Sequence, residues 1–99
     1  MKPRNELSRE AAENMAIQAL TYLVGDPERL DRFLSLSGLD HDSIRAASSE
    51  PGFLGGVLEH LTSDERLLIE FAEFAGLNPV EVDRARAQLS GERWQRDVP

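Results

Sequence analysis

The chain nearly repeats itself at an offset of 38 residues, and this repeat constrains its fold more than any other feature. Residues 16–47 align without a gap on residues 54–85. Most of the matched positions are ones that a helical domain needs, namely apolar faces, N-caps and helix-ending glycines. The repeat therefore describes a scaffold and indicates no particular chemistry. The identical pairs are Leu20/Leu58, Leu23/Leu61, Asp26/Asp64, Leu30/Leu68, Phe33/Phe71, Gly38/Gly76, Leu39/Leu77 and Ala47/Ala85.

Two interpretations of this repeat stay open at the level of sequence. A true duplication would pair two similar three-helix halves and bury their apolar faces against each other, as an approximately twofold bundle. Alternatively, leucine-rich amphipathic helices of similar length align by chance. Under both interpretations we expect an all-α fold, a compact bundle of five to six short helices.

Capping signals place these helices along the chain. Ser, Asp and Asn side chains accept hydrogen bonds from the first N–H groups of a helix, and proline fits its first position. At Thr62 we expect a capping box, in which the Thr62 hydroxyl and the Glu65 carboxylate each accept from the other residue's N–H. The other expected helix starts are Ser8, Asp26–Pro27, Asp40, Pro51 and Asn78–Pro79, and the expected ends include Gly25, Gly38 and Gly76.

Length and composition predict one domain. Ninety-nine residues suffice for a single hydrophobic core. We expect a helical domain over residues 8–91, preceded by a flexible N-terminus (1–7) and followed by a C-terminal tail (92–99). The chain contains no cysteine, which excludes disulfides and thiolate metal sites and fits a reducing cytosol.

The net charge of −7 is unevenly distributed. Residues 26–83 carry thirteen acidic side chains and four arginines, a net charge of −9. Such a body repels phosphate groups, which disfavours nucleic acids and anionic membranes as partners. The uncharged segment Met15–Gly25 is about half as long as a membrane span. We therefore expect a cytoplasmic protein without a membrane segment.

Four residues stand out as a candidate interaction surface. Gly55 and Gly56 lie inside an expected helix, where two glycines cost about 1–2 kcal/mol relative to alanines. Either the close approach of another helix or of a bound group offsets this cost, or the first helical turn is frayed. His60 lies near the end of the same helix. Trp94 lies between arginines in the tail, where it either anchors a partner or packs back onto the bundle.

Other patterns favour alternative functions only weakly. Ala72, Gly76 and Val82 have the spacing of a helix-turn-helix motif, but the acidic residues on the second helix would repel DNA. Asp40-His41-Asp42 has the side chains of a metal site without a second cluster, so we expect helix capping by Asp40 instead. Walker and G-x-S-x-G patterns are missing, and we predict no catalytic residue, metal or cofactor.

Two phrases of the sequence resemble a known family. Arg32-Phe33-Leu34 and Pro51-Gly52-Phe53-Leu54, with the surrounding apolar positions of residues 11–85, are similar to a family of short bacterial proteins defined as a domain of unknown function. The resemblance implies a small helical cytosolic protein and no known activity. Gly55-Gly56 departs from the alanine-rich continuation expected in that family.

The functional expectation follows mainly by elimination. We predict a non-enzymatic protein-interaction module that binds a protein partner or a second copy of itself. The alternatives are a helical bundle that binds or converts a small molecule, and a helix-turn-helix DNA-binding regulator.

Overall fold

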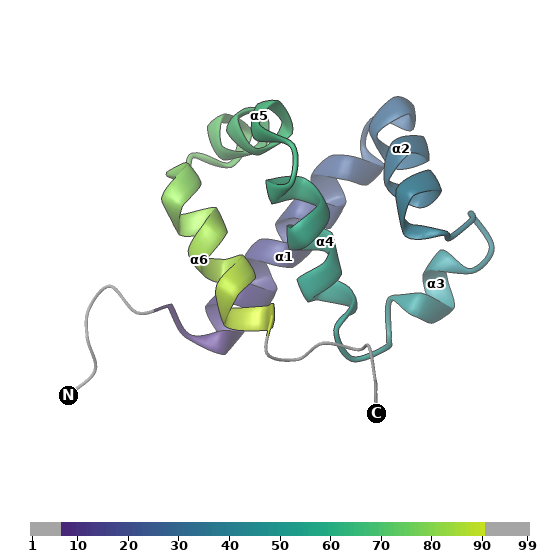
Figure 1. Cartoon of the computed structure of the whole chain (residues 1–99), viewed down its shortest axis with the longest axis horizontal. Helices are drawn as coiled ribbons and strands as arrows, with labels where there is room; N and C mark the ends of the chain where they lie inside the picture. Colours follow the sequence, from purple (N-terminus) through teal and green to yellow (C-terminus); the bar gives the residue numbers. More distant parts are fainter. Residues whose placement is uncertain (1–6, 91–99) are drawn as a thin grey trace.

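The computed structural model describes residues 7–90, and this part of the chain consists of six α-helices (Figure 1). They confirm the predicted all-α bundle. No helix among the described residues has the length and apolarity that membrane crossing requires. The helices are α1 (Arg9–Val24), α2 (Pro27–Ser37), α3 (Ile44–Ala47), α4 (Phe53–Thr62), α5 (Glu65–Ala75) and α6 (Pro79–Leu89).

Helices α1, α4 and α6 pack most extensively against one another and form the centre of the fold. Figure 1 shows α1 running diagonally behind α4, with α6 beside them. The face that α1 buries is rich in alanine: Ala12, Ala16 and Ala19 are completely covered. Small side chains allow helix axes to approach closely, because the interaxial distance depends on the residues at the contact. Helix α2 then packs against α1, and helix α5 packs against α4, α6 and α1.

The predicted apolar faces supply most of the core. Met15 and Tyr22 are also buried, although the helical pattern did not single them out. Aromatic contacts attach the outer helices to the centre. Phe71 of α5 meets Tyr22 of α1 at a ring distance of 5.5 Å, and Phe33 of α2 meets Phe53 of α4 at 6.3 Å. The largest completely buried side chains are Phe71, Leu23, Leu58, Leu61, Val57 and Val82.

The middle helices of the two halves follow the same plan. Asp26 and Asp64 cap α2 and α5, and each carboxylate accepts hydrogen bonds from two backbone N–H groups. Gly38 and Gly76 end these helices in the left-handed conformation, with φ of 74° and 70°. Both helices are eleven residues long. The predicted cap at Asp26 and the predicted stops at Gly38 and Gly76 are confirmed.

The third helices differ. Helix α6 has eleven residues and a capping box between Asn78 and Glu81. Helix α3 has only four residues, because the segment before it forms a turn. In that turn the Asp40 carboxylate accepts from the N–H groups of Asp42 and Ser43, so Asp40 caps the turn and not the helix. The similarity of the halves therefore ends at the third helix, and the duplication itself stays a prediction.

Besides Asp40, two other expected helix starts are wrong. Thr62 is the last residue of α4 and donates its hydroxyl to the Leu58 carbonyl (2.9 Å), so it takes no part in a capping box. Asp64 is the N-cap of α5 instead, since its carboxylate reaches two N–H groups without help from Thr62. Helix α4 begins at Phe53 and not at Pro51, because Gly52 adopts a left-handed φ of 87°.

The cap assignment predicts unequal effects of two substitutions. We expect Asp64→Ala to lower the free energy of unfolding by about 0.5–2 kcal/mol, because two N–H groups lose their acceptor. We expect a clearly smaller change for Thr62→Ala, which removes only a bond within α4. Urea denaturation of both variants measures the difference, and equal losses would support the capping box instead.

Candidate functional site

Three of the four predicted interaction residues lie on α4, and each has different neighbours. Gly55 faces α6, whereas Gly56 faces open space. His60 lies in the last turn of α4, against α2. Trp94 lies outside the described residues. These residues therefore do not form one continuous surface in the described part of the chain.

Gly55 allows α6 to pack closely against α4. A Cβ atom at this position would lie 3.1 Å from the carbonyl oxygen of Leu89 and 3.4 Å from its Cβ. Gly55 itself is buried. The close approach of a neighbouring helix, one of the interpretations left open by the sequence, thus explains this glycine.

Gly56 has a different environment. A Cβ atom there would meet nothing within 4 Å. The residue borders a small hollow of about 160 Å³, whose walls include Phe33, Phe53 and Leu39. This volume is below the range of about 300–1,000 Å³ that is typical of small-molecule sites. The structure gives no reason for a glycine at position 56.

His60 packs as a half-buried aromatic residue. Its ring meets the Phe33 ring edge-on at 5.1 Å, and its Nε2 atom is buried without a hydrogen-bond partner among the described residues. Burial lowers the pKa of His60 below its ordinary value of 6.5, and the Arg32 guanidinium lowers it further, whereas Asp64 opposes the shift. The neutral imidazole is thus favoured, and its Nε2 is covered by protein.

The surface beside His60 has mixed charges. A groove of about 370 Å³ runs between the starts of α2 and α5 and the end of α4. Arg29 and Arg66 line it, but they pair with Asp26 at 3.5 Å and with Glu70 at 3.8 Å. The charges of this groove largely compensate each other, so it has no strong preference for an ion of either sign.

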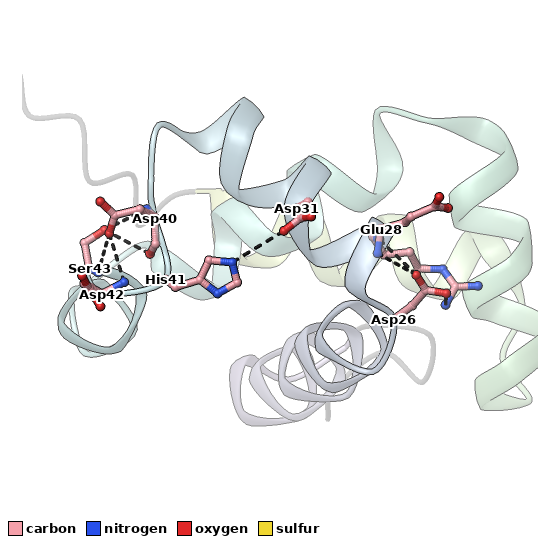
Figure 2. A network of polar contacts seen from close by, with 8 residues as sticks. Asp26, Glu28, Asp31, Asp40, His41, Asp42 and Ser43 are labelled. Atoms are coloured by element: carbon pink, nitrogen blue, oxygen red, sulfur yellow. Dashed lines mark hydrogen bonds and ion pairs between the residues drawn. The ribbon is translucent and has the colours of Figure 1, made fainter.

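The Asp40-His41-Asp42 segment points its side chains in different directions. Figure 2 shows the Asp40 carboxylate turned toward the backbone of Asp42 and Ser43. The His41 imidazole instead reaches Asp31 on α2, with 3.5 Å between Nε2 and the carboxylate. The backbone bonds to Ser43 are the main reason that the pKa of Asp40 is lowered. Among residues 7–90, no three His, Cys, Asp or Glu side chains are grouped as metal ligands.

Helices α5 and α6 do form a helix-turn-helix arrangement. Ala72 and Val82 are buried on either side of the left-handed Gly76, as their spacing predicts. The exposed residues at the start of α6 include Glu81 and Asp83. Carboxylates at that position repel a phosphate backbone, which disfavours DNA as a partner.

A groove with an exposed aromatic side chain lies between the end of α1 and α5, and no sequence pattern indicated it. Its volume is about 780 Å³, and we call it the α1–α5 groove. Phe74 is 66% exposed and packs one side of its ring on Tyr22, at 4.9 Å between centroids. The residues that line it are Thr21, Tyr22, Gly25, Arg29, Glu70, Glu73 and Phe74.

Charged groups surround the aromatic pair Tyr22 and Phe74, which we call the aromatic shelf. The Arg29 guanidinium lies 4.2 Å from the centre of the Tyr22 ring, a cation–π contact that holds both side chains in place. Glu70 and Glu73 are exposed on the α5 side. Phe74 follows Phe71 by three residues, a spacing that usually places two side chains on one buried face. Helical periodicity alone therefore does not indicate that Phe74 is exposed.

Comparison with known proteins supplies a family but no activity. A family model described as "Protein of unknown function (DUF3572)" matches residues 9–92. No curated protein and no solved structure matches the chain.

The two adjacent glycines predict opposite effects on stability. We expect Gly56→Ala to raise the free energy of unfolding by about 0.5–1 kcal/mol, because alanine favours the helix and meets no neighbour. We expect Gly55→Leu to lower it by about 1–3 kcal/mol, because the added atoms would collide with α6. Urea denaturation measures both values, and similar changes at the two positions would contradict the close approach of α6.

His60 predicts a dependence of stability on pH. Because its pKa is lower in the folded chain, the unfolded chain binds a proton first as the pH falls below 6.5. The free energy of unfolding should therefore decrease from pH 6.5 down to the lowered pKa. Thermal denaturation at a series of pH values should show a shallower decrease for His60→Gln than for the unaltered chain. An unchanged slope in this variant would show that His60 does not cause it, and His41→Gln provides the exposed control.

Proposed function

Since the chain belongs to the DUF3572 family, whose function is unknown, we propose its function from its own geometry. We propose a non-enzymatic protein-interaction module of the bacterial cytoplasm. Its α1–α5 groove receives an apolar side chain of a partner protein. The observation that carries this proposal is that Phe74 is exposed while one side of its ring packs on the buried Tyr22.

Covering Phe74 would stabilise a complex. Full burial of a phenylalanine side chain contributes about 1.5–3 kcal/mol, and most of that gain is still available at 66% exposure. The shelf under Phe74 is already ordered, because Tyr22 is buried and Arg29 packs against it. A partner therefore does not have to order the floor of the groove, which favours affinity.

The charges around the groove select the kind of partner. Glu73 on the α5 side complements a basic residue, Glu70 is paired with the exposed Arg66 at 3.8 Å, and the body of the chain is strongly acidic. We therefore propose a segment of another protein that carries an apolar or aromatic side chain next to Lys or Arg. Such a segment gains both burial of apolar area and electrostatic attraction during association.

The alternative of a small-molecule site has one supporting observation. The volume of the α1–α5 groove falls within the range of ligand pockets. The polar residues of the groove favour a partner protein over a small ligand. Arg29 is already engaged with Tyr22 and with Asp26 at 3.5 Å, and Glu70 and Glu73 lie at the edge of the groove. A fixed small ligand needs converging polar groups that remain available to it.

Site-specific cross-linking tests the proposal. A photoreactive phenylalanine analogue replaces Phe74 in living cells, and the matched control carries it in place of Leu36. The two positions correspond in the 38-residue repeat and are equally exposed, at 66% and 67%. We expect a discrete product with one protein at position 74 and none at position 36. The same products at both positions would contradict the proposal.

Affinity measurements with the captured protein then test the role of the aromatic side chain. We expect Phe74→Ser to weaken binding by about tenfold or more, as for other aromatic hot spots. Leu36→Ser should leave the affinity unchanged. Thermal denaturation of both variants provides the control for folding, and an unchanged affinity of Phe74→Ser would refute the groove as the binding site.

A further inference from the structure

A second hollow lies where α6 ends, at the opposite end of α1 from the α1–α5 groove. Its volume is about 230 Å³. Gly55 and Leu89 form its floor, Pro51 and Leu54 supply apolar walls, and Glu13 and Glu50 provide carboxylates. We call this cavity the α6-end hollow. Arg9 lines it as well, so the hollow combines aliphatic walls with two carboxylates and one guanidinium.

The size of the α6-end hollow fits one large side chain better than a cofactor. Small-molecule sites usually have volumes of about 300–1,000 Å³, which is more than this cavity offers. A tryptophan side chain is large and apolar and carries one N–H donor, so it suits a hollow whose walls combine aliphatic groups with oxygen atoms.

The carboxylates on the rim differ in their availability. Glu13 pairs with Arg9 on the same helix at 3.3 Å. Glu50 is exposed and makes no ion pair with another described residue. The hollow therefore offers one carboxylate to a cation that would accompany an apolar side chain.

The chain itself carries a matching segment directly beyond α6. Trp94 is flanked by Arg93, and Arg96 follows two residues later. Trp94 lies four positions after Ser90, the last described residue, and four positions span up to about 14 Å when extended. Because Leu89 is part of the hollow, Trp94 begins within reach of it.

We propose that the C-terminal segment of this chain seats Trp94 in the α6-end hollow and pairs Arg93 or Arg96 with Glu50. The segment then joins the start of α1, the turn before α4 and the end of α6. This inference does not depend on the proposed function, since the groove and the hollow lie at opposite ends of α1.

Fluorescence tests the proposal directly, because Trp94 is the only tryptophan of the chain. In the folded full-length protein we expect a blue-shifted emission and acrylamide quenching several-fold weaker than in a peptide of residues 88–99. Glu50→Lys should bring the quenching close to that of the peptide. Glu59→Lys, an exposed acidic residue of α4 outside the hollow, should leave it unchanged. Emission and quenching equal to those of the peptide would overturn the proposal.

Nuclear Overhauser effects identify the contact. We expect effects between the Trp94 indole and the Leu54 methyl groups, at intensities independent of protein concentration. Effects to Phe74 or Tyr22 would place Trp94 in the α1–α5 groove and overturn the proposal. Light scattering measures dimer formation in the same samples. If Trp94 is protected from acrylamide only when the protein dimerises, the hollow receives Trp94 of a second copy, and the proposal is overturned.

Discussion

The close packing of α1, α4 and α6 determines the rest of the structure. Gly55 brings the backbone of α4 close to Leu89 at the end of α6, so there is no room for even one methyl group without a shift. The alanines of α1 leave similarly little space on the third side. Val82 and Ala85 of α6 are completely buried in this unit. A domain of this size has a small core, so the fit of these three helices is central to its stability.

The candidate surfaces follow from this central unit. Helix α5 is attached through Phe71, which packs on Tyr22 of α1. The last turn of α5 projects beyond this contact and presents Phe74 over the same tyrosine ring. At the other end of α1, the missing side chain of Gly55 that admits α6 also helps to form the α6-end hollow. The contact of Phe71 with Tyr22 thus accounts for the α1–α5 groove, and Gly55 accounts for the α6-end hollow.

Much of the fold was predictable because its signals are local. The cap at Asp26 and the stops at Gly38 and Gly76 depend on single residues and their neighbours. The competition between Thr62 and Asp64 for the start of α5 was not predictable, because both are good capping residues and their positions in the turn decide between them. The start of α3 was misplaced for a similar reason, since Asp40 caps a turn as well as it caps a helix.

The candidate site was less predictable than the fold. The glycine pair drew attention to α4, but only the tertiary structure distinguishes Gly55, which touches α6, from Gly56, which does not. The α1–α5 groove joins residues about fifty positions apart in the sequence, and its key residue Phe74 lies at a spacing typical of buried residues. Exposure of this kind depends on where a neighbouring helix ends, and a single sequence does not carry that information.

The most direct test of the α1–α5 groove as the binding surface is NMR chemical-shift mapping. The isotopically labelled protein is compared before and after addition of the purified partner captured through position 74. The account predicts that the largest shifts cluster at Tyr22, Gly25, Glu73 and Phe74. Shifts concentrated at Gly56 and His60, with the groove unchanged, would contradict it and would favour the surface on α4 that the sequence alone suggested.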